Sequence, residues 1–183
     1  MTDSGLRLPA PDEYAPFYAG YIATAAEADV RMLLEQQVPA LRMACEPLSE
    51  AGADYRYAPG KWSVKEVIGH LSDSERVFSY RALCIARGEH AALPGFDEND
   101  YVAAANFERR STRDLLRELE SARATTLTLS ASVEPQAWTR RGIANQLEVS
   151  LRAIAYIIAG HMQHHLGTLG ERYNLVIDPA GAG

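Results

Sequence analysis

The helical spacing of apolar residues is the feature that most restricts how this sequence can fold. Apolar residues recur every three to four positions in four long stretches, 26–51, 63–87, 111–131 and 150–173. The second stretch has the clearest start, because Ser63 and Glu66 have the spacing of a capping box, in which each side chain accepts a hydrogen bond from the other residue's backbone amide. Amphipathic helices bury their apolar faces most simply against one another, so the sequence predicts an all-α four-helix bundle.

The segments between these stretches set the expected topology. Stretch 89–110 has no sustained helical period and is rich in turn formers, so we expect a long loop there. A connection of this length can return along the bundle, which would make the second and third helices parallel. Pro39 is expected to kink or break the first helix. No strand-like alternation of useful length is visible, and Pro135 and Trp138 fall in a connection with room for a single helical turn.

Length and charge limit the class of protein. The chain has 183 residues and a formal net charge of -6, which suits one domain and argues against a protein that binds nucleic-acid phosphates. We expect an N-terminal arm over residues 1–26, the bundle domain over 27–175 and a flexible tail over 176–183.

The rest of the composition favours a cytoplasmic protein. The start of the sequence lacks the basic and apolar blocks of a signal peptide, and no apolar run is long enough for a membrane helix. The two cysteines, Cys45 and Cys84, are too few for a disulfide framework, and both lie in helical stretches. We therefore expect buried free thiols and no membrane partner.

The histidines provide the strongest functional signal. His161, His164 and His165 fall within five consecutive positions of the last helical stretch. At about 100° per residue, His165 lies within the apolar stripe of that helix, and His161 lies about 40° away and one turn earlier. His164 falls at the edge of the same face. His161 and His165 should therefore point inward as a pair that can bind one metal ion.

A third ligand is available on the second helix. His70 lies on or beside the buried face, about two turns from the start of its helix, and His165 lies about two turns from the end of the last helix. If these helices are antiparallel, His70, His161 and His165 meet at one level of the bundle. Three imidazoles leave one position of a divalent metal open, which is typical of a catalytic site. The alternative is three unrelated histidines, each satisfied in the core or at its boundary.

Neighbouring residues suggest chemistry around such a metal. The glutamate of the HExxH metalloprotease motif is absent, which argues against peptide hydrolysis by that route. If the metal activates water, Asp73 or His164 would accept the proton, although Asp73 can equally be a surface residue or a residue that orients a histidine. At the same end of the bundle, Tyr57, Trp62 and Arg172 would line the mouth of a substrate pocket. Trp62 is also suited to a packing role at the start of the helix.

Three segments of the sequence carry a resemblance to a known family: YAPGKWSVKEVIGHLSDSERVFSYRAL (57–83), LPGFDENDYV (93–102) and AGHMQHHLGTLGERY (159–173). Over about residues 27–173 the sequence resembles the DinB-like (DNA-damage-inducible) four-helix-bundle proteins. The resemblance implies that His70, His161 and His165 bind a divalent metal, with nickel or zinc expected, and that the protein is a homodimer.

The activities found in that family differ. Some members resemble thiol S-transferases that use bacillithiol or mycothiol, others are thiol-dependent maleylpyruvate isomerases, and many are described only as metal-dependent hydrolases. The resemblance therefore implies three possibilities: transfer of a low-molecular-weight thiol to a small electrophile, metal-dependent hydrolysis, or a non-enzymatic role as a metal-binding stress-response protein. The first is preferred because the metal would supply the thiolate without help from Cys45 or Cys84.

Overall fold

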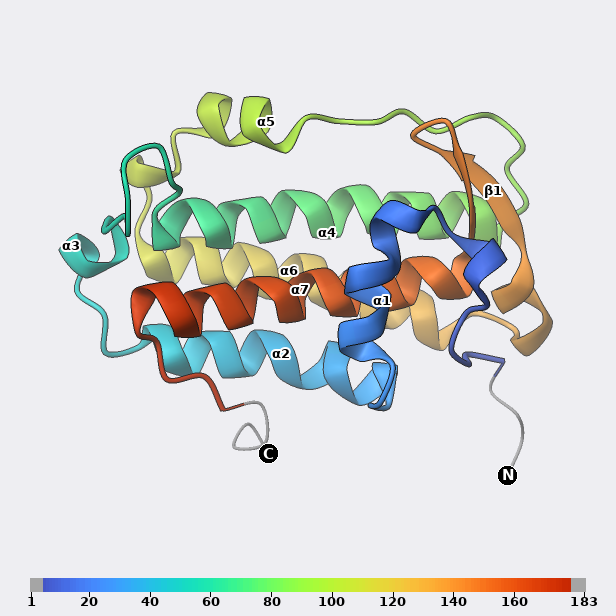
Figure 1. The fold of residues 1–183 in the computed structure, drawn as a ribbon, viewed down its shortest axis with the longest axis horizontal. Helices are drawn as coiled ribbons and strands as arrows, with labels where there is room; N and C mark the ends of the chain where they lie inside the picture. Colours follow the sequence, from blue (N-terminus) through green and yellow to red (C-terminus); the bar gives the residue numbers. More distant parts are fainter. Residues whose placement is uncertain (1–4, 179–183) are drawn as a thin grey trace.

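Four long helices form the body of the protein. In the computed structural model, which describes residues 5–178, helices α2, α4, α6 and α7 lie side by side along the longest axis (Figure 1). Their bounds are Val30–Cys45, Val64–Ala86, Thr112–Ala131 and Leu151–Tyr173. The prediction of an all-α four-helix bundle is confirmed.

The direction of the helices is also as expected. Helices α4 and α6 run in the same direction, and α2 and α7 run in the opposite direction (Figure 1). The connection between α4 and α6 returns along the outside of the bundle, which makes this parallel pair possible. Because α4 and α7 are antiparallel, the early part of α4 lies beside the late part of α7.

The predicted helix starts are present at the serines. Ser63 Oγ accepts a hydrogen bond from the Glu66 amide at 3.2 Å, and Glu66 Oε2 accepts one from the Ser63 amide at 2.6 Å, which completes the capping box of α4. Ser111 caps α6 and Ser150 caps α7 in the same way, each through the amide three residues later. A serine side chain therefore caps the start of three of the four bundle helices.

The first helical stretch differs from its prediction. It is divided into α2 and a short helix α3, Glu50–Ala53, and α2 begins after Asp29, whose carboxylate accepts a hydrogen bond from the Arg31 amide at 2.9 Å. Pro39 does not break α2. Residues on both sides of it are buried, with Val38 2% and Leu41 0% exposed, so packing offsets the hydrogen bond that proline removes.

The expectation of an unstructured connection over 89–110 was wrong in part. Helix α5 spans Glu98–Ala105, and a 3-10 turn follows at Phe107–Arg109. Asp97 caps α5 by accepting hydrogen bonds from the amides of Asn99 and Asp100 at 2.8 and 3.2 Å. Within α5 only Val102 is buried, so the sequence carries no periodic apolar face that would have revealed the helix.

The absence of strands was also a wrong prediction. Strands β1, Arg141–Ala144, and β2, Leu147–Ser150, pair as an antiparallel hairpin just before α7. Asn145 and Gln146 form its two-residue loop, with φ values of 51° and 63°, as a tight hairpin turn requires. Four-residue strands are too short to show an alternating pattern. The 3-10 helix Pro135–Thr139 matches the predicted single turn.

The expected N-terminal arm folds onto the bundle. Its described part contains two 3-10 turns, Pro11–Glu13 and Pro16–Tyr18, followed by helix α1, Ala19–Ala25, which crosses α7 (Figure 1). Arg152 donates a hydrogen bond from Nε to Glu13 Oε2 at 2.7 Å, and this guanidinium holds the pKa of Glu13 at about 2. The arm is therefore part of the packed structure.

The end of the described chain also contacts the bundle. Leu175 is buried and Ile177 packs against the core, whereas residues 179–183 of the predicted flexible tail lie outside the described residues. Within residues 5–178, no helix combines the length and the apolarity that a membrane crossing requires.

Candidate metal centre

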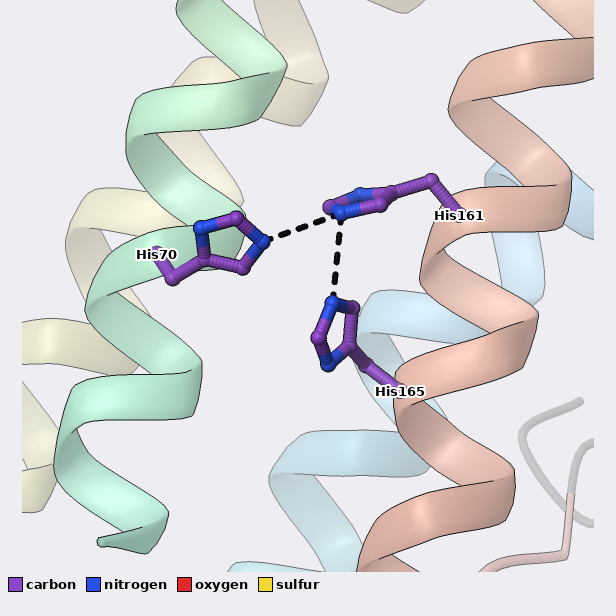
Figure 2. A group of neighbouring side chains, drawn as sticks. All are labelled: His70, His161 and His165. Carbon is purple, nitrogen blue, oxygen red and sulfur yellow. Dashed lines mark hydrogen bonds between the residues drawn. The ribbon is translucent and has the colours of Figure 1, made fainter. Parts of the chain in front are cut away.

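Three histidine side chains converge between α4 and α7. Figure 2 shows the ring of His70 from α4 pointing toward those of His161 and His165 from α7. The Nε2 atom of His161 lies 3.0 Å from Nε2 of His70 and 3.2 Å from Nε2 of His165. One nitrogen from each of the three rings lies within 4.8 Å of the others. The antiparallel arrangement thus brings the three predicted ligands to one point.

Burial keeps these rings neutral. His70 and His161 are 5% and 8% exposed. Burial lowers the pKa of His70 to about 4 and that of His165 to about 3. The pKa of His161 lies well below its ordinary value because of burial and, next, because of repulsion between its protonated form and those of His165 and His70. Neutral imidazole is the form that binds a metal ion.

The donor set fits a divalent cation. A neutral imidazole nitrogen carries either one proton or one lone pair, so His161 Nε2 cannot form a full hydrogen bond with both of its neighbours. One cation would be bound by all three lone pairs at once. Two ligands at the usual zinc–nitrogen distance in a tetrahedral site lie about 3.3 Å apart, close to the two shorter separations.

A glycine precedes each of the two most buried histidines. Next to His70, Gly69 lies under the ring of Phe107, where an added Cβ would come within 2.4 Å of the ring. Next to His161, Gly160 lies under the backbone of Tyr21, where an added Cβ would come within 1.8 Å of the carbonyl oxygen. These glycines let the 3-10 turn after α5 and helix α1 pack directly against the helices that carry the ligands.

A cavity of about 300 Å³ opens on the triad; we call it the inner cavity. All three histidines line it, together with Ser74 and Arg81 from α4 and Glu98 from α5. Much of the remaining wall is aromatic: Phe17, Tyr18, Tyr21, Phe78 and Phe96. Tyr21 and Phe78 contact His161 edge to face, with ring centroids 5.4 and 6.1 Å apart. A small organic molecule can therefore lie against the triad in a largely aromatic enclosure.

A second cavity, of about 530 Å³, lies on the other side of His165; we call it the outer cavity. Its walls are more polar and include Lys61, Asn99 and Glu171. Tyr57, Trp62 and Arg172, the predicted pocket residues, all line it, and the Arg172 guanidinium lies 6.0 Å from the centre of the Tyr57 ring. The structure brings these three residues together near the triad, and contact with a substrate stays a prediction.

The two predicted proton acceptors differ in position. His164 is exposed and lines both cavities, with its ring centroid 5.2 Å from that of His165. Asp73 lines neither cavity. Its carboxylate lies 3.7 Å from Arg76, near α6, and burial raises its pKa. The structure thus places His164 at the edge of the triad, as expected, and does not bring Asp73 to the site.

Several residues of the site were missed by the sequence analysis. Tyr21 belongs to the expected arm, and Glu98 to the expected loop, so neither was considered. Ser74 and Arg81 lie four and eleven residues after His70, and this helical spacing could have revealed them on the same face of α4. Trp62 was predicted, and its indole lies 4.7 Å from the His70 ring, which it covers.

Comparison with known proteins agrees with this description. The family model described as the DinB superfamily matches residues 33–169. The chain belongs to the DinB superfamily. Among solved structures it is similar to one described as "YfiT from Bacillus subtilis is a probable metal-dependent hydrolase with an unusual four-helix bundle topology", with a TM-score of 0.72 and 20% identity over 80% of this chain and 87% of that one. A search of curated proteins finds no significant match.

For this DinB-superfamily chain, the cysteines are separate from the centre. Cys45 lies in the bundle core, where burial raises the pKa of its thiol to about 12. Cys84 is half-buried on α4, and neither cysteine lines the two cavities. Neither cysteine is therefore placed to act as a nucleophile at the triad.

Proposed function

We propose that this protein is an enzyme that uses a divalent metal ion, nickel or zinc, bound by His70, His161 and His165. The observation that carries the proposal is the convergence of three neutral imidazole nitrogens at the wall of a cavity. Imidazole suits both metals. When bound, such an ion would lower the pKa of a thiol or a water molecule, so that a nucleophile exists at neutral pH.

The preferred reaction is transfer of a low-molecular-weight thiol, of the bacillithiol type, to a small electrophile. Two cavities meet at the triad and share Trp62, His164 and His165, as a reaction of two substrates requires. The polar outer cavity suits the thiol cofactor, with Lys61 and Arg172 available to its polar groups. The aromatic inner cavity suits the electrophile. His164, which lines both, can accept the thiol proton, and the sulfur then bonds to carbon while the electrophile's leaving group, such as chloride, departs.

The second candidate is metal-dependent hydrolysis. YfiT, which shares the fold, is described as a probable metal-dependent hydrolase. In this chain, His164 and Glu98 line the inner cavity and would be the proton acceptors for water. Asp73, our other predicted acceptor, faces Arg76 instead.

Metal analysis of the purified protein, followed by turnover assays, tests the proposal. We expect about one divalent ion per chain and metal-dependent transfer of bacillithiol to monochlorobimane. The Cys45→Ala/Cys84→Ala double variant should retain this activity, because neither thiol lines the site. Ester or amide cleavage without added thiol would favour the hydrolase. A metal-bearing protein that carries out neither reaction would favour the non-enzymatic stress-response role.

The remaining proposals concern the state of the protein in the cell. We propose a cytoplasmic homodimer, on the basis of the family resemblance and the composition. Sedimentation equilibrium of the full chain tests the oligomeric state.

A further inference from the structure

Arg81 is a buried cation without a carboxylate partner. It is 4% exposed, and its Nη2 donates a hydrogen bond to the Pro94 carbonyl at 2.7 Å. Its Nε has no hydrogen-bond partner, and among residues 5–178 no carboxylate lies within ion-pairing distance of it. The guanidinium lies 5.5 Å from the centre of the Phe78 ring and 6.0 Å from that of Phe96, and it also hydrogen-bonds the side chain of Tyr18, a neutral group. Aromatic rings therefore surround this guanidinium. The other buried charged side chains among the described residues each pair with a group of opposite charge.

Ser74 adds a second unpartnered group to the same cavity. It is 1% exposed, and its Oγ has no hydrogen-bond partner. Among the described residues, three buried side-chain polar atoms lack a partner: Ser74 Oγ, Arg81 Nε and Trp138 Nε1. Two of the three line the inner cavity. Because such atoms are rare and costly in folded proteins, their concentration here indicates a place that a ligand fills.

The placement of these groups fits one extended molecule. His70, Ser74 and Arg81 lie on one face of α4, with Phe78 between the last two, so the unpartnered donors and the triad line a single cavity. Glu98 also lines this cavity but is exposed and unpaired with Arg81. With a divalent ion on neutral imidazoles, the cavity would be positive overall, which attracts an anion.

We propose that Arg81 and Ser74 form a carboxylate-binding subsite, so that the molecule attacked at the triad is a small aromatic carboxylic acid. This inference rests on the proposed function, because it assigns the substrate class of the same site. The carboxylate accepts hydrogen bonds from Arg81 Nε and Ser74 Oγ, the donors that lack partners. The apolar part packs against Phe78 and Phe96, and the reacting end faces the histidines. Charge-assisted hydrogen bonds of this kind are short and strong.

Binding of matched probes to the full chain tests the subsite. Phenylacetate and phenylacetamide differ in charge but little in shape, and calorimetric titration gives both dissociation constants. We expect wild-type protein to bind the acid at least about tenfold more tightly than the amide, in both metal-loaded and metal-free forms. Arg81→Gln should reduce this preference to about twofold or less, and Ser74→Ala should reduce it by a smaller factor.

The control is Arg87→Gln, which removes the same charge from the exposed end of α4 and should keep the preference. Thermal unfolding checks that each variant is folded. If Arg81→Gln does not fold, two other variants test the subsite. Arg81→Lys keeps the charge but loses Nε, and Ser74→Ala loses the hydroxyl; both must lower the preference for the acid. An unchanged preference in folded variants would show that Arg81 only holds the Pro94 carbonyl, and would overturn the proposal.

Two further outcomes also overturn it. A preference for the acid that is present only with metal would mean that the carboxylate binds the ion. Tighter binding of phenylphosphonate than of phenylacetate would make the site one for phosphorus oxyanions. The preference in the metal-free protein does not depend on turnover. If the enzyme is active but shows no preference for the acid, the proposed function holds and the subsite does not. If the protein prefers the acid but has no metal-dependent activity, the subsite holds and the proposed function does not.

Discussion

Two clusters of polar side chains interrupt the apolar core of the bundle, and helix α4 contributes to both. One is the triad with Arg81 and Ser74. The other is centred on Arg123 of α6, which donates hydrogen bonds from Nε and Nη2 to the two carboxylate oxygens of Glu75 at 2.8 and 2.9 Å. Its Nη1 donates to the Leu34 carbonyl at 2.8 Å. Every charged group of this second cluster has a partner of opposite charge or a hydrogen bond.

The second cluster also connects all four helices of the bundle. Gln37 of α2 lies 3.5 Å from Arg123 and donates hydrogen bonds to the Ala159 carbonyl at 2.9 Å and to Gln163 Oε1 at 3.2 Å, both on α7. Gln163 lies in sequence between His161 and His165, the two proposed ligands on that helix. The Arg123 cluster therefore fixes the relative positions of the helices that carry the ligands.

The comparison separates a polar cluster that is fully paired within the protein from one that is not. Arg123 and Arg81 are almost equally buried, at 3% and 4% exposed, and both lie in the bundle interior. The first is fully paired within the protein, and the second lacks an acid and lines a cavity. The exposed fraction of a buried arginine thus does not indicate its role. The number of its hydrogen-bond donors that have partners within the protein does.

The largest expected effect concerns the triad. Replacing His70, His161 or His165 by Ala should weaken binding of a divalent metal by more than about 100-fold, because loss of a ligand exceeds the 10- to 100-fold cost of losing a ligand's supporting group. His164→Ala is the matched control and should change affinity little, because it lies at the edge of the site. Competition with a metal-binding dye gives the constants. Metal loss in His164→Ala with retention in His161→Ala would refute the ligand assignment.

The next effect compares the two arginines directly. Arg123→Met should lower the free energy of unfolding by about 3–5 kcal/mol, since it leaves the buried Glu75 carboxylate unpaired. Arg81→Met removes a charge that has no acid partner, together with its hydrogen bonds to two neutral groups, the Pro94 carbonyl and the Tyr18 side chain, so its effect should stay below about 2 kcal/mol. Urea unfolding measures both. The Glu75→Leu/Arg123→Met double variant should recover part of the loss, and equal losses for the two single variants would remove the distinction.

A smaller effect is expected from pH in the metal-free protein. The pKa of His70 is about 4 when folded and about 6.5 when unfolded, so the unfolded chain binds more protons between these values. Stability should therefore be fully present above about pH 6.5 and fall as the pH drops toward 4, by on the order of 2–3 kcal/mol for this residue. Urea unfolding at a series of pH values gives the slope. His70→Leu should reduce it, and an unchanged slope would contradict the burial of this ring as the cause.

The smallest predicted effect concerns the start of α4, which carries members of both clusters. Ser63→Ala removes the cap and should lower the free energy of unfolding by about 1 kcal/mol. Because His70 follows on the same helix, metal affinity should fall slightly as well. Thermal unfolding of the metal-free variant measures the first effect. Ser63→Thr, which keeps the hydroxyl, is the control, and an unaltered midpoint for Ser63→Ala would exclude a capping role.

The sequence revealed what is encoded by local periodicity and by caps. The four bundle helices and the inward face of His70, His161 and His165 follow from spacing alone, because a helix places residues in a fixed geometry. The parallel pair follows from the length of the connection between α4 and α6. The close approach of His161 to His70, 91 positions apart, needed only the antiparallel pairing of α4 and α7 in addition. This is why the triad could be predicted before the structure was known.

The surroundings of the triad could not be predicted in the same way. Tyr21 and Glu98 reach the site through α1 and α5, short helices that have no long apolar period. Hairpin β1–β2 holds the segment before α5, since the Asn145 amide donates to the Leu93 carbonyl at 2.9 Å, and this contact joins parts of the chain that no local pattern connects. Helical spacing could have placed Arg81 on the same face of α4 as His70. That its Nε has no hydrogen-bond partner could be seen only in the folded structure.

The antiparallel pairing of α4 and α7 has a consequence for the order of assembly. Two of the three histidines of the triad lie on α7, the last helix of the described chain, and His70 lies 91 positions before His161. During synthesis, His70 therefore leaves the ribosome long before His161 and His165. A nascent chain can offer an ion only one of the three imidazoles until α7 has emerged and docked. If the triad binds a divalent ion as proposed, binding by all three imidazoles would mark the completion of the bundle.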